Sequence, residues 1–401
     1  MKVIPMGMAE HIEEPARRVR VLGNYDVVVV GGGIAGVAAA VSAERAGAHT
    51  CLIEKENAPG GLATLGLVAI FLPLCDGRGH QLMAGMAEEL LELSIRYGPG
   101  ELPECWRPGG NPAHRRRRRY STVFNPASFL LALEELLENE GVELLYDSRF
   151  CALKTKDDGQ VEAVVVENKS GRLAIRCDAV VDATGDADVA HCAGEDTVSL
   201  DTNPRSAWYY SFDGSDIQLH KRHDQLYSNG AGEGMTFAAD NCHDVTRMSV
   251  ESRKMIPRDS GGDEYPVVVP VIPQFRMSRR LKGPFELDEV EGESFPDAVG
   301  WTGDWRRSGP TYCLPLRCLM GQRTGNLLMA GRCVSVTNSM WDIIRAIPTC
   351  AVTGQAAGAG SALLSDEGGS VMDMEVGELQ ALLREQGAIV DRPISGKKGN
   401  L

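Results

Sequence analysis

The sequence predicts an α/β protein with a parallel sheet at its centre. Residues 26–30 are a run of β-branched residues that leads into a glycine turn, a small-residue helix at 37–46 and a second apolar run at 49–53. This order of strand, turn, helix and strand is one complete βαβ unit. Two later apolar runs, at 179–182 and 326–330, are also followed by glycine-containing turns, and we predict that both are strands.

The turn of the βαβ unit has the spacing that binds a dinucleotide. Residues 31–36 are Gly-Gly-Gly-Ile-Ala-Gly and fit G-x-G-x-x-G. Gly31 permits the tight turn, Gly33 lets the backbone approach a pyrophosphate, and Gly36 lets the helix pack close to the strand. Glu54 ends the second strand and is placed to accept a hydrogen bond from a ribose hydroxyl. The alternative is a glycine-rich turn in another kind of α/β protein.

The glycine motif alone fits either FAD or NAD(P), so other segments must decide. Gly60 and Gly61 form a turn shortly after Glu54, residues 183–186 are Ala-Thr-Gly-Asp, and residues 347–358 are a small-residue helix. With these segments the chain resembles the FAD-dependent oxidoreductases of the glutathione-reductase-like fold. Within them it is most similar to the group related to fumarate reductase and succinate dehydrogenase flavoproteins. The resemblance runs from about residue 21 to 363 and implies a Rossmann-like FAD-binding domain.

The motif and the resemblance together predict the residues that bind FAD. Many members of the group have Pro where this chain has Ile34, a departure that we expect to leave phosphate binding intact. The predicted FAD-binding residues are Gly31, Gly33, Ile34, Ala35, Gly36, Glu54, Lys55, Gly60, Gly61, Ala63, Thr64, Ala183, Thr184, Gly185, Asp186, Gly331, Arg332 and Ile347. The eleven cysteines contain no C-x-x-C, so we expect no metal or iron–sulfur site.

The resemblance also implies that the FAD-binding domain is interrupted by an inserted α+β cap, or substrate, domain. Between 192 and 312 the pattern becomes irregular and richer in Trp, Tyr, His and Pro. The predicted organisation is an N-terminal arm at 1–24, the FAD-binding domain at 25–191 and 313–364, the cap at 192–312 and a tail at 365–401. We expect the tail to be helical, with residues 391–401 mobile.

Shorter patterns predict individual elements. Residues 82–93 have the spacing of an amphipathic helix. Asn125 is placed to cap a helix that begins at Pro126 and ends before Gly141. Predicted strands cover 142–146, 161–167 and 173–181, with a hairpin turn at 157–159. Residues 99–112 are predicted to be an ordered loop.

Arg345 and His80 are the candidate catalytic residues. In fumarate-reductase-like flavoproteins an arginine in the neighbourhood of Arg345 binds a substrate carboxylate, which a guanidinium fits bidentately. The alternative role is a salt bridge to Asp342 or Glu54. The resemblance takes the start of residues 65–80 along the flavin ring, so His80 is placed to transfer a proton. A single histidine is nevertheless more often structural.

Two arginine clusters stand out. Residues 115–119 are five consecutive arginines, which either attract an anionic substrate or form a solvated loop that pairs with the protein's many acids. We favour the second interpretation. Arg276, Arg279 and Arg280 lie late in the predicted cap, where some of them are expected at the mouth of the site.

Composition excludes some function classes. A net charge of −14 argues against a nucleic-acid-binding surface, and no apolar run approaches the ~20 residues that span a bilayer. We therefore expect a cytoplasmic FAD-dependent oxidoreductase that transfers a hydride between FAD and a small organic substrate held between the two domains. The alternatives are a flavoprotein subunit that passes electrons to a separate partner protein, or a redox-neutral flavoenzyme. The substrate, the reaction direction, the electron donor or acceptor, covalent attachment of FAD and the oligomeric state stay open.

Overall fold

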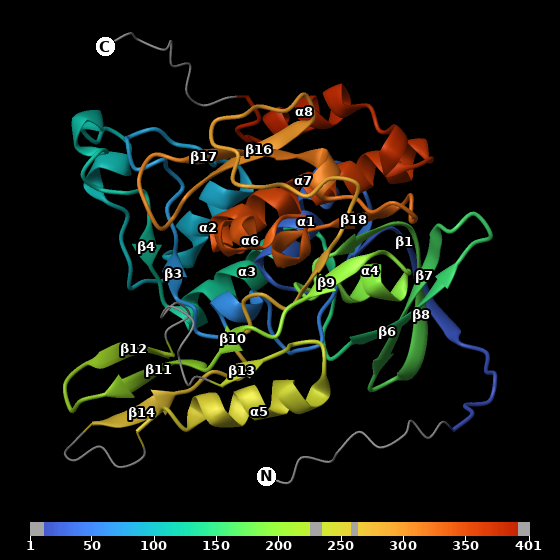
Figure 1. The fold of residues 1–401 in the computed structure, drawn as a ribbon, viewed down its shortest axis with the longest axis horizontal. Coiled ribbons are helices and arrows are strands. Elements are labelled where there is room, and N and C mark those ends of the chain that lie inside the picture. Colours follow the sequence, from blue (N-terminus) through green and yellow to red (C-terminus); the bar gives the residue numbers. More distant parts are fainter. Residues whose placement is uncertain (1–11, 225–234, 258–263, 392–401) are drawn as a thin grey trace.

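The computed structural model describes residues 12–224, 235–257 and 264–391 (Figure 1). The first part of the predicted arm and all but the first residue of the predicted mobile tail lie outside the described residues.

A seven-stranded sheet forms the centre of the fold. Four parallel strands lie side by side in the order β5 (Glu143–Leu145), β2 (Thr50–Ile53), β1 (Arg20–Val30) and β8 (Gly171–Asp182). Towards its carboxyl end β8 pairs in parallel with β18 (Leu327–Met329). Along its first half it pairs antiparallel with β7 (Val161–Asn168), which pairs in turn with β6 (Arg149–Thr155). The predicted α/β fold with a parallel sheet is confirmed.

β1 is longer than the sequence indicated. Its first residues, 20–25, pair with residues 173–177 of β8, so the strand begins well before Asp26. Residues 20–24, which the sequence placed in an arm, therefore belong to the sheet. The strands predicted at 142–146, 161–167 and 173–181 are present as β5, β7 and β8.

Helices α1 (Ile34–Arg45) and α7 (Ile347–Glu367) pack against each other with their backbones in contact. A Cβ atom on Gly354 would lie 2.2 Å from the carbonyl oxygen of Ala35, and one on Gly358 would lie 2.0 Å from that of Ala39. Small residues are therefore required along this glycine seam, which places the first turn of α1 beside Gly354 of α7.

Two further helices flank this pair. In α3 (Pro126–Glu140) the Asn125 side chain accepts hydrogen bonds from two backbone amides, and the helix ends at Gly141 in a left-handed conformation, as predicted. Helix α2 (Met86–Ser94) begins four residues later than predicted. Gly85 has a φ of 58°, and the amide of Met86 donates to the Gln355 side chain instead of continuing a helix backward.

A second unit lies at the lower left of Figure 1. It contains a three-stranded sheet in the order β12 (Ile217–His223), β11 (Ser206–Phe212) and β14 (Tyr265–Val268), beside helix α5 (Cys242–Arg253). Its apolar residues form two small clusters, separate from the large core around the central sheet. Strand β16 (Ala298–Gly303) packs instead on α7, where Val352 faces Gly300, and β17 (Thr311–Pro315) pairs with β16. The exact domain boundaries stay a prediction.

The remaining elements are short. They are η1 (Gly61–Ala63), β3 (Ile70–Phe71), η2 (Glu104–Trp106), η3 (Pro112–His114), β4 (Thr122–Val123), α4 (Asp188–Cys192), β9 (Thr197–Ser199), β10 (Asn203–Pro204), β13 (Thr236–Phe237), β15 (Arg279–Leu281), η4 (Leu316–Cys318), η5 (Gly331–Cys333), α6 (Asn338–Ile344), η6 (Val371–Asp373) and α8 (Val376–Glu385). Within the described ranges, every helix is too short or too polar to cross a membrane.

Candidate functional site

The glycine turn between β1 and α1 leaves open space at one position and none at the other two. Gly31 has a φ of 104°, and a Cβ atom there would lie 2.6 Å from the carbonyl oxygen of Ala183. A Cβ atom on Gly36 would lie 1.8 Å from the carbonyl oxygen of Gly31. At Gly33 a Cβ atom would meet no heavy atom within 4 Å. The space in front of the α1 N-terminus is therefore free at Gly33, where a phosphate group fits.

Glu54 faces this turn from the end of β2. Its carboxylate accepts hydrogen bonds from the amides of Gly32, at 2.6 Å, and Glu56, at 2.8 Å. Burial nevertheless raises the pKa of Glu54, because these amides only partly offset the loss of solvation. The sequence did not predict a role for Gly32, because it occupies a variable position of the glycine motif. Its amide nevertheless orients the Glu54 carboxylate. Lys55, the next residue, is exposed.

The Gly60–Gly61 turn lies against the glycine turn. The amide of Gly60 donates to the carbonyl oxygen of Gly32 at 2.7 Å, and a Cβ atom on Gly61 would lie 3.3 Å from the Cα atom of Gly33. Thr64 fixes the segment by donating to the carbonyl oxygen of Pro59 at 2.5 Å. The predicted residues Ala63 and Thr64 are themselves buried.

The Ala-Thr-Gly-Asp turn follows β8 and is held by Asp182. This buried carboxylate accepts from the hydroxyl of Thr184 at 2.6 Å and from the amide of Ala190 at 3.0 Å. Burial raises the pKa of Asp182 to about 6. Asp186, at the end of the turn, pairs with Arg332 at 3.3 Å. The turn therefore lies between the first glycine turn and the segment that follows β18.

That segment completes the site. Gly331 has a φ of 80°, and a Cβ atom there would lie 2.8 Å from the Cβ atom of Ala35 in α1. Its amide donates to the hydroxyl of Thr353 in α7 at 3.0 Å. Ile347 is the first residue of α7 and is half-buried. The start of α7 and the start of α1 thus meet at Gly331, on the same side as the three turns.

A family model described as FAD dependent oxidoreductase matches residues 26–205 and 248–383. The chain belongs to the FAD-dependent oxidoreductase family. FAD is its cofactor, and the open space at Gly33 fits the phosphate groups of this cofactor. The resemblance to FAD-dependent oxidoreductases that the sequence indicated is confirmed.

Individual relatives align with only part of this chain. Thioredoxin reductase from Ureaplasma parvum serovar 3 is 37% identical over 71 residues, which cover 18% of this chain and 23% of the relative. A fumarate reductase (cytochrome) from Shewanella frigidimarina is 26% identical over 189 residues, which cover 40% of this chain and 33% of the relative. The chain spans a third or less of the length of these relatives.

Solved structures resemble this flavoenzyme over most of its length at low identity. CabE, an aromatic hydroxylase from angucycline biosynthesis, has a TM-score of 0.49 and 16% identity over 90% of this chain and 66% of its own. A geranylgeranyl bacteriochlorophyll reductase-like protein from Thermoplasma acidophilum has a TM-score of 0.46 and 15% identity over 91% of this chain and 84% of its own.

Arg345 lies between α6 and α7 and pairs with Asp342. Its Nε atom donates to the Asp342 carboxylate at 3.1 Å, and its second contact to the same oxygen comes from Nη2. The guanidinium also lies over the ring of Trp305, 5.8 Å from its centroid. The alternative role considered for Arg345, a salt bridge to Asp342, is therefore present. A substrate-binding role stays a prediction.

The three arginines near 276–280 differ in their partners. Arg279 pairs with Asp188 at 2.5 Å and Arg280 pairs with Glu286 at 2.7 Å. Arg276 has no carboxylate within 4 Å among the described residues, and its Nη2 atom contacts only the hydroxyl of Ser206 at 3.3 Å. Burial lowers the pKa of Arg276 to about 10, the nearby charge of Arg345 acts in the same direction, and Asp342 opposes them.

This arginine segment is fastened to the FAD side of the molecule at both ends. The Gln274 side chain donates to the carbonyl oxygen of Gly66 at 2.5 Å. Arg332 donates to the carbonyl oxygen of Phe275, and Arg280 donates to the Asn338 side chain in α6 at 3.1 Å. Arg276 is consequently held beside α6 and Arg345 rather than at the outer surface.

His80 is oriented by a buried carboxylate. Its Nδ1 atom lies 2.7 Å from the Asp76 carboxylate, which also accepts from the amides of Arg78 and His80. Burial alone would raise the pKa of Asp76, but these hydrogen bonds outweigh it and hold the pKa below its usual value. The His80 side chain is 48% exposed, and its second ring nitrogen has no partner among the described residues. The ring is thus positioned with one nitrogen available.

The five-arginine run does not pair with acids as expected. Arg119 donates to the carbonyl oxygens of Trp305, at 2.8 Å, and Asp304, at 3.0 Å. Arg115 donates to the carbonyl oxygen of Cys105 and stacks on the ring of Trp106. Residues 116–118 are exposed, and in the part of the chain that the structure describes none of the five forms an ion pair with a carboxylate. The favoured interpretation is wrong in this respect.

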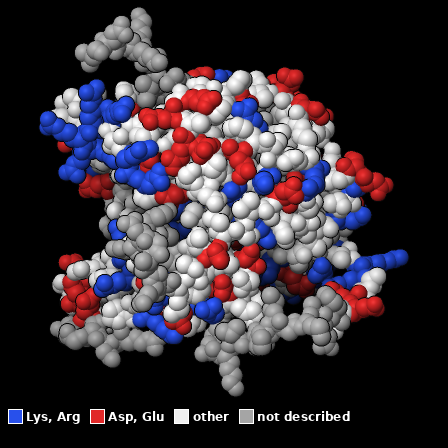
Figure 2. All heavy atoms as spheres, viewed as in Figure 1, with Lys and Arg blue, Asp and Glu red and all other residues white. Residues whose placement is uncertain are grey.

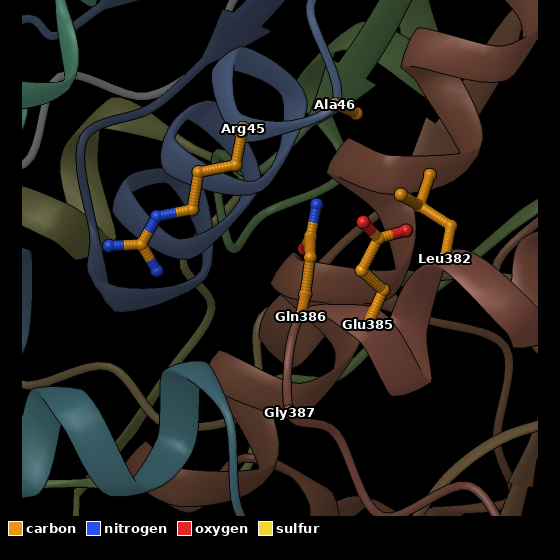
Figure 3. A pocket seen from close by; sticks show the side chains of 6 residues that line it. All are labelled: Arg45, Ala46, Leu382, Glu385, Gln386 and Gly387. Carbon is orange, nitrogen blue, oxygen red and sulfur yellow. The ribbon is translucent and has the colours of Figure 1, made fainter.

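A surface hollow elsewhere has no part in this site (Figure 3). It lies between the end of α1 and α8 and is lined by Arg45, Ala46, Leu382, Glu385, Gln386 and Gly387. Because α1 rises about 1.5 Å per residue, its end is roughly 17 Å from the glycine turn. Across the described ranges, no three potential ligand side chains are grouped closely enough to hold a metal ion.

Proposed function

We propose that the protein transfers a hydride between FAD and a small organic anion held between the FAD-binding domain and the unit around β11 and α5. The observation that carries this proposal is the pair of Arg276 and Arg345. These two cations come from the two parts of the chain, and Arg276 has no carboxylate partner in the described residues. Asp342 pairs with Arg345 and opposes part of this charge at Arg276. A substrate anion between the two guanidiniums would stabilise them further.

The residues present fit FAD in a defined way. Glu54 would accept from the adenosine ribose, and the glycine turn, the Gly60–Gly61 turn and the α1 N-terminus would hold the pyrophosphate. Bound FAD supplies two-electron redox chemistry. The N-terminus of α7 offers its positive dipole to negative charge beside Gly331.

In this proposal the two arginines bind the substrate. Arg345 would bind a carboxylate or carbonyl oxygen bidentately, while Asp342 keeps its guanidinium in one orientation. Arg276 would contact the same anion from the other side. Neither residue needs to gain or lose a proton, because a guanidinium stays charged at neutral pH.

His80 would exchange a proton with the substrate. Asp76 fixes the ring and the tautomer through Nδ1, which leaves Nε2 to accept or donate the proton. This division of roles does not depend on the direction of the reaction, which the proposal leaves open. The cytoplasmic location also stays a prediction.

The experiment begins with a screen of small carboxylic and carbonyl compounds for bleaching of the flavin absorbance. With a substrate in hand, Arg345→Lys, Arg345→Ala and Arg276→Lys should lower kcat/KM by roughly tenfold to a hundredfold. A charged hydrogen bond contributes about 1.5–3 kcal/mol, and tenfold in rate corresponds to about 1.4 kcal/mol. FAD content should be nearly unchanged.

The matched control is Arg384→Lys. Arg384 is an exposed arginine in α8, and it pairs with Asp391, which follows that helix. Wild-type efficiency in all three site variants would show that these arginines are structural. Turnover with an artificial electron acceptor and no partner protein separates this proposal from an electron-transferring subunit, which would show none.

A further inference from the structure

Three loops meet beside His80 and form one surface. They are residues 75–80, 114–120 and 304–310. The amide of Gly309 donates to the carbonyl oxygen of Asp76 at 2.8 Å, and that of Tyr120 donates to the Sγ atom of Cys75 at 3.2 Å. Arg119 joins the second loop to the third through the carbonyl oxygens of Asp304 and Trp305. We call this surface the arginine rim.

The rim is strongly basic in an acidic protein. Figure 2 shows blue side chains gathered at the upper left, where Figure 1 draws the teal segment that precedes β4. The three loops contain two carboxylates, Asp76 and Asp304, and both already accept hydrogen bonds from residues of the rim. Against them stand eight arginines: Arg78, Arg115, Arg116, Arg117, Arg118, Arg119, Arg306 and Arg307. Of these, Arg306 also pairs with Glu289 and Asp342 outside the three loops.

The basic loop is fixed by Trp106, while three of its arginine side chains have no hydrogen-bond partner among the described residues. Trp106 donates its indole N–H to the carbonyl oxygen of Arg118 at 2.7 Å and stacks under Arg115, whose guanidinium lies 4.5 Å from the ring centroid. Residues 116–118 are exposed, and their side chains have no hydrogen-bond partner within the described parts of the chain.

The free arginines are adjacent to the proposed catalytic loop. A Cβ atom on Gly79 would lie 3.3 Å from the Cγ atom of Arg116, and one on Gly309 would lie 2.5 Å from a guanidinium nitrogen of Arg78. The stem of Arg116 therefore borders the loop that carries His80, and the guanidinium of Arg78, which belongs to that loop, lies against Gly309 in the third loop.

We infer that the arginine rim binds the phosphate group of a small phosphorylated molecule whose other end enters the site beside His80. A carboxylate carries one charge and two oxygens, which one or two guanidiniums satisfy. A phosphate monoester or diphosphate carries more charge and more accepting oxygens, and planar guanidiniums bind it bidentately. The run contains arginine throughout and no lysine, which favours this geometry.

This inference names a ligand class for the proposed function, and it rests on that function only for the role of His80. Phosphate binding is measured without turnover. If the enzyme is active but the rim does not bind phosphate, the proposed function stands and the rim inference fails. If the rim binds phosphate but the enzyme is inactive, the rim inference stands and the proposed function fails.

The test is calorimetric titration of the FAD-loaded protein with inorganic pyrophosphate at low ionic strength. FAD must be bound, so that its own phosphate site is filled. The triple variant Arg116→Ala, Arg117→Ala, Arg118→Ala should bind pyrophosphate at least tenfold more weakly than the wild type. The control variant Arg149→Ala, Lys156→Ala, Lys169→Ala removes three exposed cations on and beside β6, β7 and β8, and should bind as the wild type does.

Two further titrants define the ligand. Adenosine diphosphate that binds at least tenfold more tightly than pyrophosphate would identify a nucleotide, and equal affinity would identify a phosphorylated substrate without a recognised base. Malonate should bind at least tenfold more weakly than pyrophosphate. The inference is overturned if the rim variant binds pyrophosphate like the wild type, if the control loses as much affinity, or if malonate binds equally well.

Discussion

Replacing Gly33 with valine should remove FAD and leave the fold intact. A Cβ atom at this position meets no protein atom within 4 Å, and the backbone of Gly33 is extended, with a φ of −67°, which valine adopts without strain. The apoprotein should therefore change in stability by no more than about 0.5 kcal/mol, as is usual for a substitution that touches nothing. The added side chain would occupy the space in front of the α1 N-terminus.

The loss of affinity follows from the hydrogen bonds that the phosphate makes there. If two charge-assisted bonds are lost, each contributing about 1.5–3 kcal/mol, FAD binds more weakly by roughly two to four orders of magnitude. Reconstitution of apoprotein with FAD, followed by flavin fluorescence, measures this directly, and thermal unfolding of the apoprotein checks the fold. Gly377→Val is the control, because Gly377 in α8 is equally free of neighbours and far along the chain from the site. A folded Gly33→Val protein that retains stoichiometric FAD would refute the reasoning.

Three other predictions follow from single residues. His80→Ala should lower kcat roughly a hundredfold with unchanged FAD content, and an unaffected kcat would assign His80 a purely structural role. Because burial raises the pKa of Asp182 to about 6, the folded state holds a proton between pH 4 and 6 that the unfolded chain has released. The free energy of unfolding should therefore fall by about 2–3 kcal/mol as pH rises through this window. Urea titrations at pH 4 and 7 measure the fall, and Asp182→Asn should flatten it; an equal slope in the variant would contradict the assignment. Gly358→Ala should cost about 1–3 kcal/mol, seen as a lower melting temperature, since its Cβ atom would lie 2.0 Å from the carbonyl oxygen of Ala39. An unchanged melting temperature would show that α1 and α7 separate easily.

Features that depend on neighbouring residues were predictable from the sequence. The α3 cap at Asn125 and the glycine turn at residues 31–36 each arise from conformations that a few consecutive residues impose. The start of α2 was not predictable, because Gln355, 269 residues away, takes the amide of Met86. The first part of β1 likewise depends on its pairing with β8.

The partners of charged residues were the least predictable part of the site. The sequence placed Arg276, Arg279 and Arg280 together, but only the structure separates Arg276, which has no carboxylate partner among the described residues, from its two paired neighbours. The sequence also led us to expect that the Arg115–Arg119 run pairs with acids. In the structure, carbonyl oxygens and a tryptophan ring hold this run instead. Spacing along the chain carries no information about such distant contacts.

The glycine seam between α1 and α7 has a consequence for how the protein is made. Helix α1, which we propose to hold the phosphate groups, leaves the ribosome some three hundred residues before α7, whose Gly354 and Gly358 lie against its backbone. Synthesis therefore has to reach Gly358 before α1 is enclosed and the turns at Gly33 and Gly331 face each other. Cofactor capture is consequently a late event in biosynthesis, and nascent chains released before Gly331 should carry no flavin when isolated with FAD in excess.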